Sequence, residues 1–211
     1  MSADARQLRQ QLRALRRALD GTQRQQAAQA LIGHVVYWPV WAAAVHIAGY
    51  WACDGELDPA PLLEHAWAAG RQVYLPVLRD DHGLGFAPYR PDTPLHRNRF
   101  QIPEPAVSAA HWVEPAQLDV VLTPLLAFDR TGTRLGMGGG FYDRAFAFLR
   151  DPAYNGHRPT LLGLGYQCQQ TAFLVRQPWD VPLDAVLTEQ ALHLFTDASA
   201  RNSPGAGNHW I

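Results

Sequence analysis

From Val45 onward, short apolar runs typical of buried strands alternate with segments typical of helices, and this alternation is the strongest constraint on the fold. We expect strands over residues 45–51, 72–77, 84–89, 118–123, 160–166 and 185–188. A helix is expected over residues 59–69, with Gly70 as its C-terminal stop, and another from Gly140 to about Leu149. Strands separated by helices favour a mainly parallel sheet with helices on both faces. The sequence therefore predicts a three-layer α/β fold.

The residues before this alternation predict two helices. On a wheel of ~100° per residue, a set of leucines falls within about 60° and a set of arginines falls on a separate arc of roughly 100°. The leucines are Leu8, Leu12, Leu15 and Leu19, and the arginines are Arg6, Arg9, Arg13, Arg16 and Arg17. We expect the first helix to bury the leucine stripe and to present an arginine face beside it. Asp20 and the two residues after it break the chain and cap a second helix that ends at about Val36.

Composition narrows the functional classes. The chain has 211 residues, of which 47% are hydrophobic and 18% are charged, so that it can bury a large core. Its net charge of −1 argues against a protein that binds polyanions over its whole surface, and we expect no nucleic-acid partner. All 18 basic residues are arginines. The absence of lysine excludes lysine Schiff-base chemistry and the Walker phosphate-binding loop.

Residues 1–196 are expected to form one domain, and the small, polar residues 197–211 a flexible tail. Two cysteines, Cys53 and Cys168, cannot form a disulfide framework, and we expect buried thiols in a reducing cytoplasm. The longest apolar run, residues 37–44, is too short to span a bilayer. We therefore expect a soluble monomer without a membrane partner. The proline-rich residues 91–105 are expected to run over the surface as an extended loop.

The segment from Arg134 to Arg144 (RLGMGGGFYDR) is the most informative stretch for function. It follows a buried strand and opens a helix, which is where α/β proteins bind phosphate. Its glycines let the backbone approach an anion closely, and the planar guanidinium of Arg134 can hold a phosphate with two hydrogen bonds. It is not the dinucleotide-binding fingerprint, because the sixth position of the pattern that starts at Gly136 is Phe141. The alternative interpretation is a turn that needs glycine for positive φ angles alone.

Residues 129–144 (DRTGTRLGMGGGFYDR) closely resemble the signature of the 5-formyltetrahydrofolate cyclo-ligase family, whose members are also called methenyltetrahydrofolate synthetases. Further segments stand where that family has equivalents, namely residues 8–9 (LR), 55–58 (GELD), 73–77 (VYLPV) and 179–184 (WDVPLD). The resemblance covers about residues 5–190, and the glycine–aromatic–aspartate signature is its most specific part. It implies an ATP-dependent cyclisation of 5-formyltetrahydrofolate to 5,10-methenyltetrahydrofolate, with release of ADP and phosphate.

The resemblance also implies a mechanism. The γ-phosphate passes to the formyl oxygen, after which the neighbouring amine attacks the activated carbon and phosphate leaves. Such a transfer depends on alignment and charge neutralisation more than on a protein nucleophile. This is consistent with a sequence that has no convincing Ser-His-Asp or Cys-His arrangement and no paired histidine spacing for a metal.

Carried onto this sequence, the resemblance assigns residues to four roles. ATP would be bound by Arg6, Arg9, Arg134, Leu135, Gly136, Met137, Gly138, Gly139, Gly140, Phe141 and Tyr142. Arg134, Phe141 and Tyr142 would act in catalysis, and Trp51, Glu56 and Phe141 would contact the folate. Asp143 and Asp180 would hold Mg²⁺, which prefers carboxylates together with phosphate oxygens. Taken singly, each of these residues also has a structural interpretation, as a helix-dipole partner, a turn residue, a core tryptophan or a loop carboxylate.

The sequence departs from the family pattern at the phosphate-contacting positions. Family members commonly carry a basic residue where this chain has Ala5, for which Arg6 is the candidate replacement, and some carry basic residues at Met137 and Gly139.

Two alternative functions are a non-catalytic nucleotide- or phosphosugar-binding module and an RNA-binding protein that uses the arginine face. The first would bind ATP without folate-dependent ADP release, and the net charge argues against the second. The arginines of the first helix beyond Arg9 are expected to be solvated.

Overall fold

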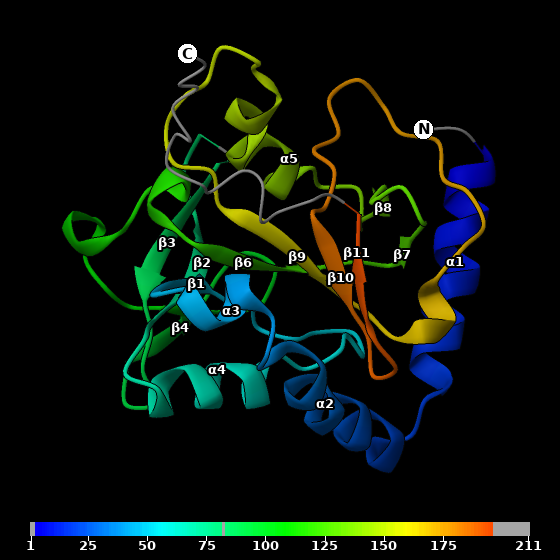
Figure 1. Cartoon of the computed structure of the whole chain (residues 1–211), viewed down its shortest axis with the longest axis horizontal. Helices are drawn as coiled ribbons and strands as arrows, with labels where there is room; N and C mark the ends of the chain where they lie inside the picture. The colour runs from blue at the N-terminus through cyan, green and yellow to red at the C-terminus, as the bar shows by residue number, and fades with distance from the viewer. Residues whose placement is uncertain (1–2, 82, 196–211) are drawn as a thin grey trace, which may run out of the picture.

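The computed structural model describes residues 3–81 and 83–195, and the expected tail at 197–211 lies outside them. Its centre is a seven-stranded sheet in the order β11-β10-β9-β6-β1-β2-β3 (Figure 1). In that order the strands span Leu192–Leu194, Ala185–Leu187, Thr160–Leu164, Val120–Pro124, His46–Ala48, Gln72–Leu78 and Leu84–Pro88. Neighbouring strands from β10 to β2 are parallel, and the edge strands β11 and β3 pair in the antiparallel sense. The prediction of a mainly parallel sheet is confirmed.

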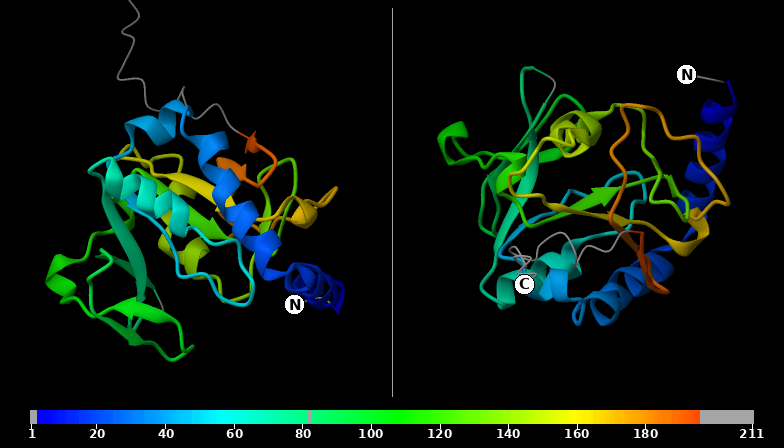
Figure 2. Two further views of the ribbon diagram at one scale, coloured as in Figure 1. Left: turned by 90° about the horizontal axis from the view of Figure 1, so that it is seen from below. Right: turned by 45° about the horizontal axis from the view of Figure 1, so that its top comes forward.

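Helices cover both faces of this sheet, which confirms the three-layer α/β fold (Figure 2). One face carries α2 (Gly21–Val35), α3 (Pro39–Ala43) and α4 (Ala60–Ala68), and the other carries α5 (Phe141–Ala145) and the 3₁₀ turn η3 (Ala147–Arg150). On the first face, Leu31 and Trp41 are fully buried in one apolar cluster with Ile47 of β1. On the second face, Phe146 is fully buried against Phe86 of β3. Both faces of the sheet are therefore core, as a parallel sheet requires.

The second helix begins where the sequence predicts. The Asp20 side chain accepts a hydrogen bond from the backbone N–H of Gln23 at 2.8 Å, and the Gln23 side chain accepts one from the Asp20 backbone N–H at 2.9 Å. This reciprocal pair satisfies two donors that would otherwise lack a partner at the helix start. It fixes the chain direction between α1 (Ala3–Ala18) and α2.

Helix α1 lies beside the sheet, along the small hairpin of β7 (Ala127–Phe128) and β8 (Arg134–Leu135) (Figure 1). Leu12 is buried there in a small apolar cluster with Ala127 and Leu174. The predicted leucine stripe is wrong at Leu15, which is 52% exposed. The predicted arginine face is wrong at Arg16, which is fully buried. Helix α1 therefore buries Arg16 against the rest of the protein and exposes Leu15 to solvent.

The strand order changes direction at β1. After β1 the chain passes through α4 to β2 on one side, and it later returns to β6 on the other side of β1. Open α/β sheets bind ligands at the carboxyl ends of their strands, where the strand order reverses in this way. Two loops start at that point, residues 49–59 after β1 and residues 125–140 after β6. The first carries Trp51 and Glu56, and the second contains the glycine-rich motif.

Three local predictions are wrong. Residues 91–105 contain a hairpin of β4 (Leu95–Arg97) and β5 (Pro103–Pro105), which lies outside the main sheet, where a proline that lacks an N–H can be accommodated in a strand. The buried Glu104 fixes this hairpin by accepting a hydrogen bond from the Leu78 backbone N–H at 3.0 Å. The helix after Gly140 ends at Ala145, because the chain continues through the buried Phe146 as the turn η3. The helix α3 and the strand β11 were not expected.

The remaining 3₁₀ turns are η1 (Ala109–His111), η2 (Pro115–Gln117) and η4 (Gln167–Gln169). Across residues 3–81 and 83–195, no helix combines the length and the apolar character that a bilayer crossing requires.

Candidate active site

The glycine-rich loop leads from β8 to α5 with an exposed backbone. Gly138 and Gly140 have φ angles of 100° and 63°, in the region that side chains rarely adopt, and Gly140 is the N-cap of α5. Met137, Gly138 and Gly139 are exposed. The loop therefore needs glycine for its conformation and also leaves its backbone accessible. Because α5 has five residues, its dipole is short, and the N–H groups of the loop itself are the main donors toward an anion.

Arg134, the expected phosphate clamp, is held by protein groups at the base of this loop. Its side chain is 6% exposed, and its guanidinium lies 2.5 Å from the Asp143 carboxylate and also donates to the Val181 backbone carbonyl. Asp143 in turn accepts a hydrogen bond from the Val181 backbone N–H at 3.1 Å. Burial lowers the pKa of Arg134, and the carboxylates of Asp143 and Asp180 act in the opposite direction. Arg134 thus joins the start of α5 to the segment that carries Asp180.

The two predicted metal ligands come together although they are far apart in the sequence. Asp143 binds the backbone of Val181, the residue after Asp180, and both carboxylates act on the charge of Arg134. The Asp180 carboxylate accepts a hydrogen bond from the Gln177 backbone N–H at 2.8 Å, which fixes it within a turn. Oxygen donors of this kind fit Mg²⁺, which is commonly bound by one or two carboxylates with phosphate oxygens and water. Among the described residues, no group of three or more His, Cys, Asp or Glu side chains is arranged for a metal ion.

Arg9 on α1 reaches the glycine loop. Its Nε donates a hydrogen bond to the Gly136 carbonyl at 2.9 Å. Arg6 lies on the same helix and is exposed. The structure therefore brings the predicted nucleotide-binding arginine of α1 to the loop, which was not evident from helical periodicity.

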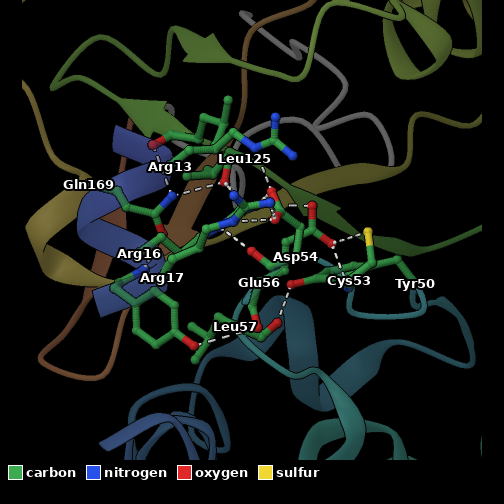
Figure 3. Close-up of polar contacts among 12 residues, drawn as sticks. Arg13, Arg16, Arg17, Tyr50, Cys53, Asp54, Glu56, Leu57, Leu125 and Gln169 are labelled. Carbon is green, nitrogen blue, oxygen red and sulfur yellow. Dashed lines mark hydrogen bonds and ion pairs between the residues drawn. The ribbon is translucent and has the colours of Figure 1, made fainter. Parts of the chain in front are cut away.

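Glu56 lies in the loop after β1, with a side chain that is 8% exposed (Figure 3). Its carboxylate accepts a hydrogen bond from the Cys53 backbone N–H at 3.1 Å and contacts the Cys53 thiol at 3.4 Å. The Arg16 guanidinium approaches it to 3.7 Å. Burial raises the pKa of Glu56, while the Cys53 backbone N–H and Arg16 act to lower it. The predicted folate carboxylate is therefore a nearly buried group with a cationic partner.

The aromatic residues predicted near the substrate are partly accessible. Trp51 is 39% exposed and meets the Tyr89 ring edge-on, with centroids 6.5 Å apart. It lies beyond the end of β1, in the loop rather than at the end of a strand as expected. The Phe141 ring meets Phe100 edge-on at 6.0 Å. Phe100, at the tip of the β4–β5 hairpin and 52% exposed, was missed because the surrounding prolines suggested a loop.

Tyr142 connects the two loops electrostatically. Its hydroxyl is buried and lacks a hydrogen-bond partner in the part of the chain that the structure describes. Burial raises the pKa of Tyr142, Glu56 raises it further, and Arg134 opposes both effects. The Tyr142 hydroxyl is therefore neutral and able to donate a hydrogen bond, and its pKa responds to Glu56 in one loop and Arg134 in the other. A buried donor without a protein partner is expected to find one in a ligand.

Two sequence interpretations at this site are wrong. The solvated face expected at Arg13, Arg16 and Arg17 is wrong at Arg16, which is fully buried, whereas the other two side chains are 40% and 58% exposed; all three form ion pairs with the Asp54 carboxylate (Figure 3). Cys53 and Cys168 are exposed free thiols rather than buried ones. Although the residue is exposed, its thiol is partly shielded from water; this partial desolvation and the neighbouring Glu56 raise the pKa of Cys53 to about 12, so that the thiol stays protonated at neutral pH.

Comparisons with known proteins identify the family. The sequence model of the 5-formyltetrahydrofolate cyclo-ligase family matches residues 1–189. The 5-formyltetrahydrofolate cyclo-ligase of Haemophilus influenzae is 39% identical over 183 residues, which cover 86% of this chain and 95% of that protein. The enzyme of the same name from Escherichia coli K12 is 39% identical over 179 residues, covering 84% and 96%.

Solved structures show the same fold. The 5,10-methenyltetrahydrofolate synthetase of Aquifex aeolicus superposes with a TM-score of 0.76 at 24% identity, over 97% of this chain and 96% of that one. The synthetase of Mycoplasma pneumoniae superposes with a TM-score of 0.67 at 23% identity, over 88% and 99%. Since the family match spans most of the sequence and the relatives are matched almost end to end, the chain belongs to the 5-formyltetrahydrofolate cyclo-ligase family.

Proposed function

We propose that the loops after β1 and β6 hold the two substrates of the family's reaction next to each other. As a 5-formyltetrahydrofolate cyclo-ligase, the protein converts 5-formyltetrahydrofolate and ATP into 5,10-methenyltetrahydrofolate, ADP and phosphate. The observation that carries the placement is the Tyr142 hydroxyl, which is buried without a hydrogen-bond partner among residues 3–81 and 83–195 and is influenced by Glu56 of one loop and Arg134 of the other. A ligand between the two loops would supply the missing partner.

The nucleotide half of the proposed site is the segment from Arg134 to Tyr142. Exposed backbone at residues 137–139 and the φ angles of Gly138 and Gly140 suit the close approach of phosphate oxygens. Arg9 fixes the start of the loop through Gly136. Arg134 contributes positive charge at its base, and the exposed Arg6 of α1 is the candidate for a further phosphate contact.

Asp143 and Asp180 would hold Mg²⁺ at the edge of this half. When bound there, the metal would supply charge neutralisation for the ATP phosphates. The support for this assignment is the meeting of two carboxylates around Val181 and Arg134. Arg134 pairs with Asp143 and feels the charge of Asp180, and the net negative charge that remains favours a cation.

The folate half of the proposed site contains Glu56, Trp51 and Phe141. The Glu56 carboxylate would accept hydrogen bonds from ring N–H groups, and the two partly exposed rings would contact the flat heterocycle. Phe141 follows the glycine loop directly, so that its ring borders both halves.

The residues of the site act by alignment. The formyl oxygen attacks the γ-phosphorus of ATP, the bond from that phosphorus to the β–γ bridging oxygen breaks, and ADP leaves. The neighbouring amine nitrogen then forms a bond to the activated formyl carbon, the carbon–oxygen bond breaks with loss of phosphate, and the amine gives up its proton. The loop N–H groups and Arg134 would stabilise the negative charge on the phosphates, and the protonated Tyr142 would donate a hydrogen bond to the ligand.

The reaction can be followed by the absorbance of the methenyl product in the presence of Mg²⁺ and ATP. We expect product formation that requires both ATP and 5-formyltetrahydrofolate, with one ADP released per product. ATP binding without folate-dependent ADP release would instead indicate a non-catalytic nucleotide-binding module. We also infer a monomer, and a concentration series in size-exclusion chromatography tests this.

A further inference from the structure

Arg16 is the most deeply buried charge of helix α1. Its side chain is 0% exposed, whereas Arg13 and Arg17 on the same turn are 40% and 58% exposed. Burial of a guanidinium is costly unless its donors and its charge are matched by partners. The buried Arg16 guanidinium must therefore be matched by hydrogen-bond acceptors and negative charges in the interior.

Those partners belong to two loops at the carboxyl edge of the sheet (Figure 3). The Arg16 Nε donates to the Asp54 backbone carbonyl at 3.1 Å, and one terminal nitrogen lies 2.9 Å from the Asp54 carboxylate. The other terminal nitrogen faces the Glu56 carboxylate at 3.7 Å and the Leu125 carbonyl at 3.5 Å. One side chain thus joins α1 to the loop after β1 and to the start of the loop after β6.

The loop that receives Arg16 has an unusual backbone. Asp54 has a φ of 53° and Gly55 a φ of 76°, so that two consecutive residues occupy the left-handed region. That region is unfavourable for aspartate unless the surroundings hold it there. The Arg16 bond to the Asp54 carbonyl acts on this turn directly, while Arg13 and Arg17 contact the Asp54 carboxylate alone. Glu56 follows the turn and folds back onto the Cys53 N–H.

The ionisation of Glu56 depends on several neighbours. Arg16 acts on it from α1, Tyr142 from α5, and Tyr50, Cys53 and Asp54 from the chain around its own loop, while the Tyr166 hydroxyl contacts its backbone carbonyl. Burial raises the pKa of Glu56, and Asp54 raises it further. The Cys53 N–H and Arg16 lower the pKa of Glu56, and Arg16 is the positively charged group of the two. Loss of Arg16 would therefore favour a protonated Glu56.

We propose that Arg16 is a positioning residue for the cyclo-ligase reaction, which holds the 53–56 turn and keeps the Glu56 carboxylate charged and directed toward the folate. The inference rests on the proposed role of Glu56 in folate binding. Helix α1 would then contact both loops of the site, the glycine loop through Arg9 and the 53–56 turn through Arg16.

The test compares Arg16→Met with Arg13→Met and Arg17→Met. Each variant removes one arginine from the same helix turn, but the two controls leave the contact with Glu56 in place. We expect Arg16→Met to raise the KM for 5-formyltetrahydrofolate about tenfold or more, with the KM for ATP changed less than about twofold. The acid limb of kcat/KM for the folate should move to higher pH by about one unit or more. The controls should keep the wild-type acid limb.

A second variant keeps the test valid if Arg16→Met does not fold. Arg16→Lys retains the charge but cannot reach Asp54, Glu56 and Leu125 together, so we expect a several-fold higher folate KM with a nearly unchanged acid limb. A double variant with Glu56→Gln should show no further movement of the acid limb when Arg16 is also changed. Wild-type folate KM and acid limb in either folded Arg16 variant would overturn the inference, as would equal effects in the Arg13 and Arg17 controls. If Glu56→Gln alone leaves the folate KM unchanged, the proposed folate site itself is wrong.

Discussion

Arg134 and Asp143 form an ion pair of 2.5 Å across the glycine loop, with the Val181 backbone bound to both side chains. One arginine thereby fixes the two ends of the loop and the segment that presents Asp180. The pair has a structural role in addition to any role in catalysis, and the two roles can be separated by experiment.

Asp143→Asn and Asp180→Asn should both lower activity at limiting magnesium, because each removes one of the two proposed metal ligands. Their stabilities should differ. Asp143→Asn takes the charge partner from a nearly buried arginine, and we expect a loss of about 1–3 kcal/mol in the free energy of unfolding. Asp180→Asn, whose oxygen accepts a bond from the Gln177 N–H, should cost about 1 kcal/mol or less.

The measurements are magnesium titrations of the initial rate and urea unfolding of both variants. Wild-type rates at limiting magnesium in both variants would show that these carboxylates do not bind the metal. Equal losses of stability in the two variants would show that the ion pair with Arg134 contributes no more to the free energy of unfolding than the contact of Asp180 with the Gln177 N–H.

Gly140→Val tests whether the loop conformation is needed for ATP. Gly140 has a φ of 63°, and an added Cβ would lie 3.0 Å from the Arg144 guanidinium. The valine variant should therefore distort the start of α5 and weaken ATP binding about tenfold or more, measured by calorimetry. Gly33→Val on α2, outside the proposed site, is the matched control, since a Cβ there has nothing within 4 Å and the φ is not positive. If the folded Gly140→Val variant binds ATP with unchanged affinity, the glycine-rich motif is a structural turn without a role in ATP binding.

The sequence predicted the local structure of the one segment that carries most of the candidate site. The motif from Arg134 to Asp143 has the local pattern of a strand, a glycine turn and a helix start, and the structure places it at the carboxyl edge of the sheet. Arg16 was misjudged because helical periodicity treats arginine as a surface residue, while its partner Asp54 is 38 residues away in the sequence. Ion pairs over such separations leave no local signal.

Short elements were missed for a related reason. Strands β7 and β8 have two residues each, too few for an alternating pattern to be recognised. The β4–β5 hairpin contains prolines that argue against a strand, and its position depends on the single buried carboxylate of Glu104. Tertiary contacts, rather than local propensity, decide the structure of these segments.

Asp129 should make stability depend on pH. Burial alone would raise its pKa, but bonds from the Thr131 hydroxyl and from the N–H groups of Thr131, Leu174 and Thr133 outweigh burial, and the pKa lies below the ordinary 3.8. The unfolded chain thus takes up this proton at a higher pH than the folded one. The stabilisation is complete above about pH 4 and is lost as the pH falls from 3.8 through the folded-state pKa.

Urea unfolding of wild type and Asp129→Asn at several pH values between 6 and about 3 tests this prediction. The stability difference between the two proteins should shrink as the pH falls below about 4. The exposed Asp92→Asn is the charge-matched control. A difference for Asp129→Asn that stays constant over this range would show that the carboxylate is not stabilised in the folded state.

Glu56→Gln tests the folate half of the site. Glutamine keeps the shape and one oxygen acceptor toward the Cys53 N–H, but it loses the negative charge beside Arg16 and offers a folate N–H a weaker acceptor. Hydrogen bonds to charged groups contribute about 1.5–3 kcal/mol, so the folate KM should rise about tenfold or more, with the ATP affinity little changed. Steady-state kinetics with each substrate varied in turn measures both values. Equal loss of affinity for ATP and folate would indicate a general disturbance of the fold, which circular dichroism would reveal. No change in either would place Glu56 outside the folate site, and its burial beside Arg16 would then be explained by the stability of the 53–56 turn alone.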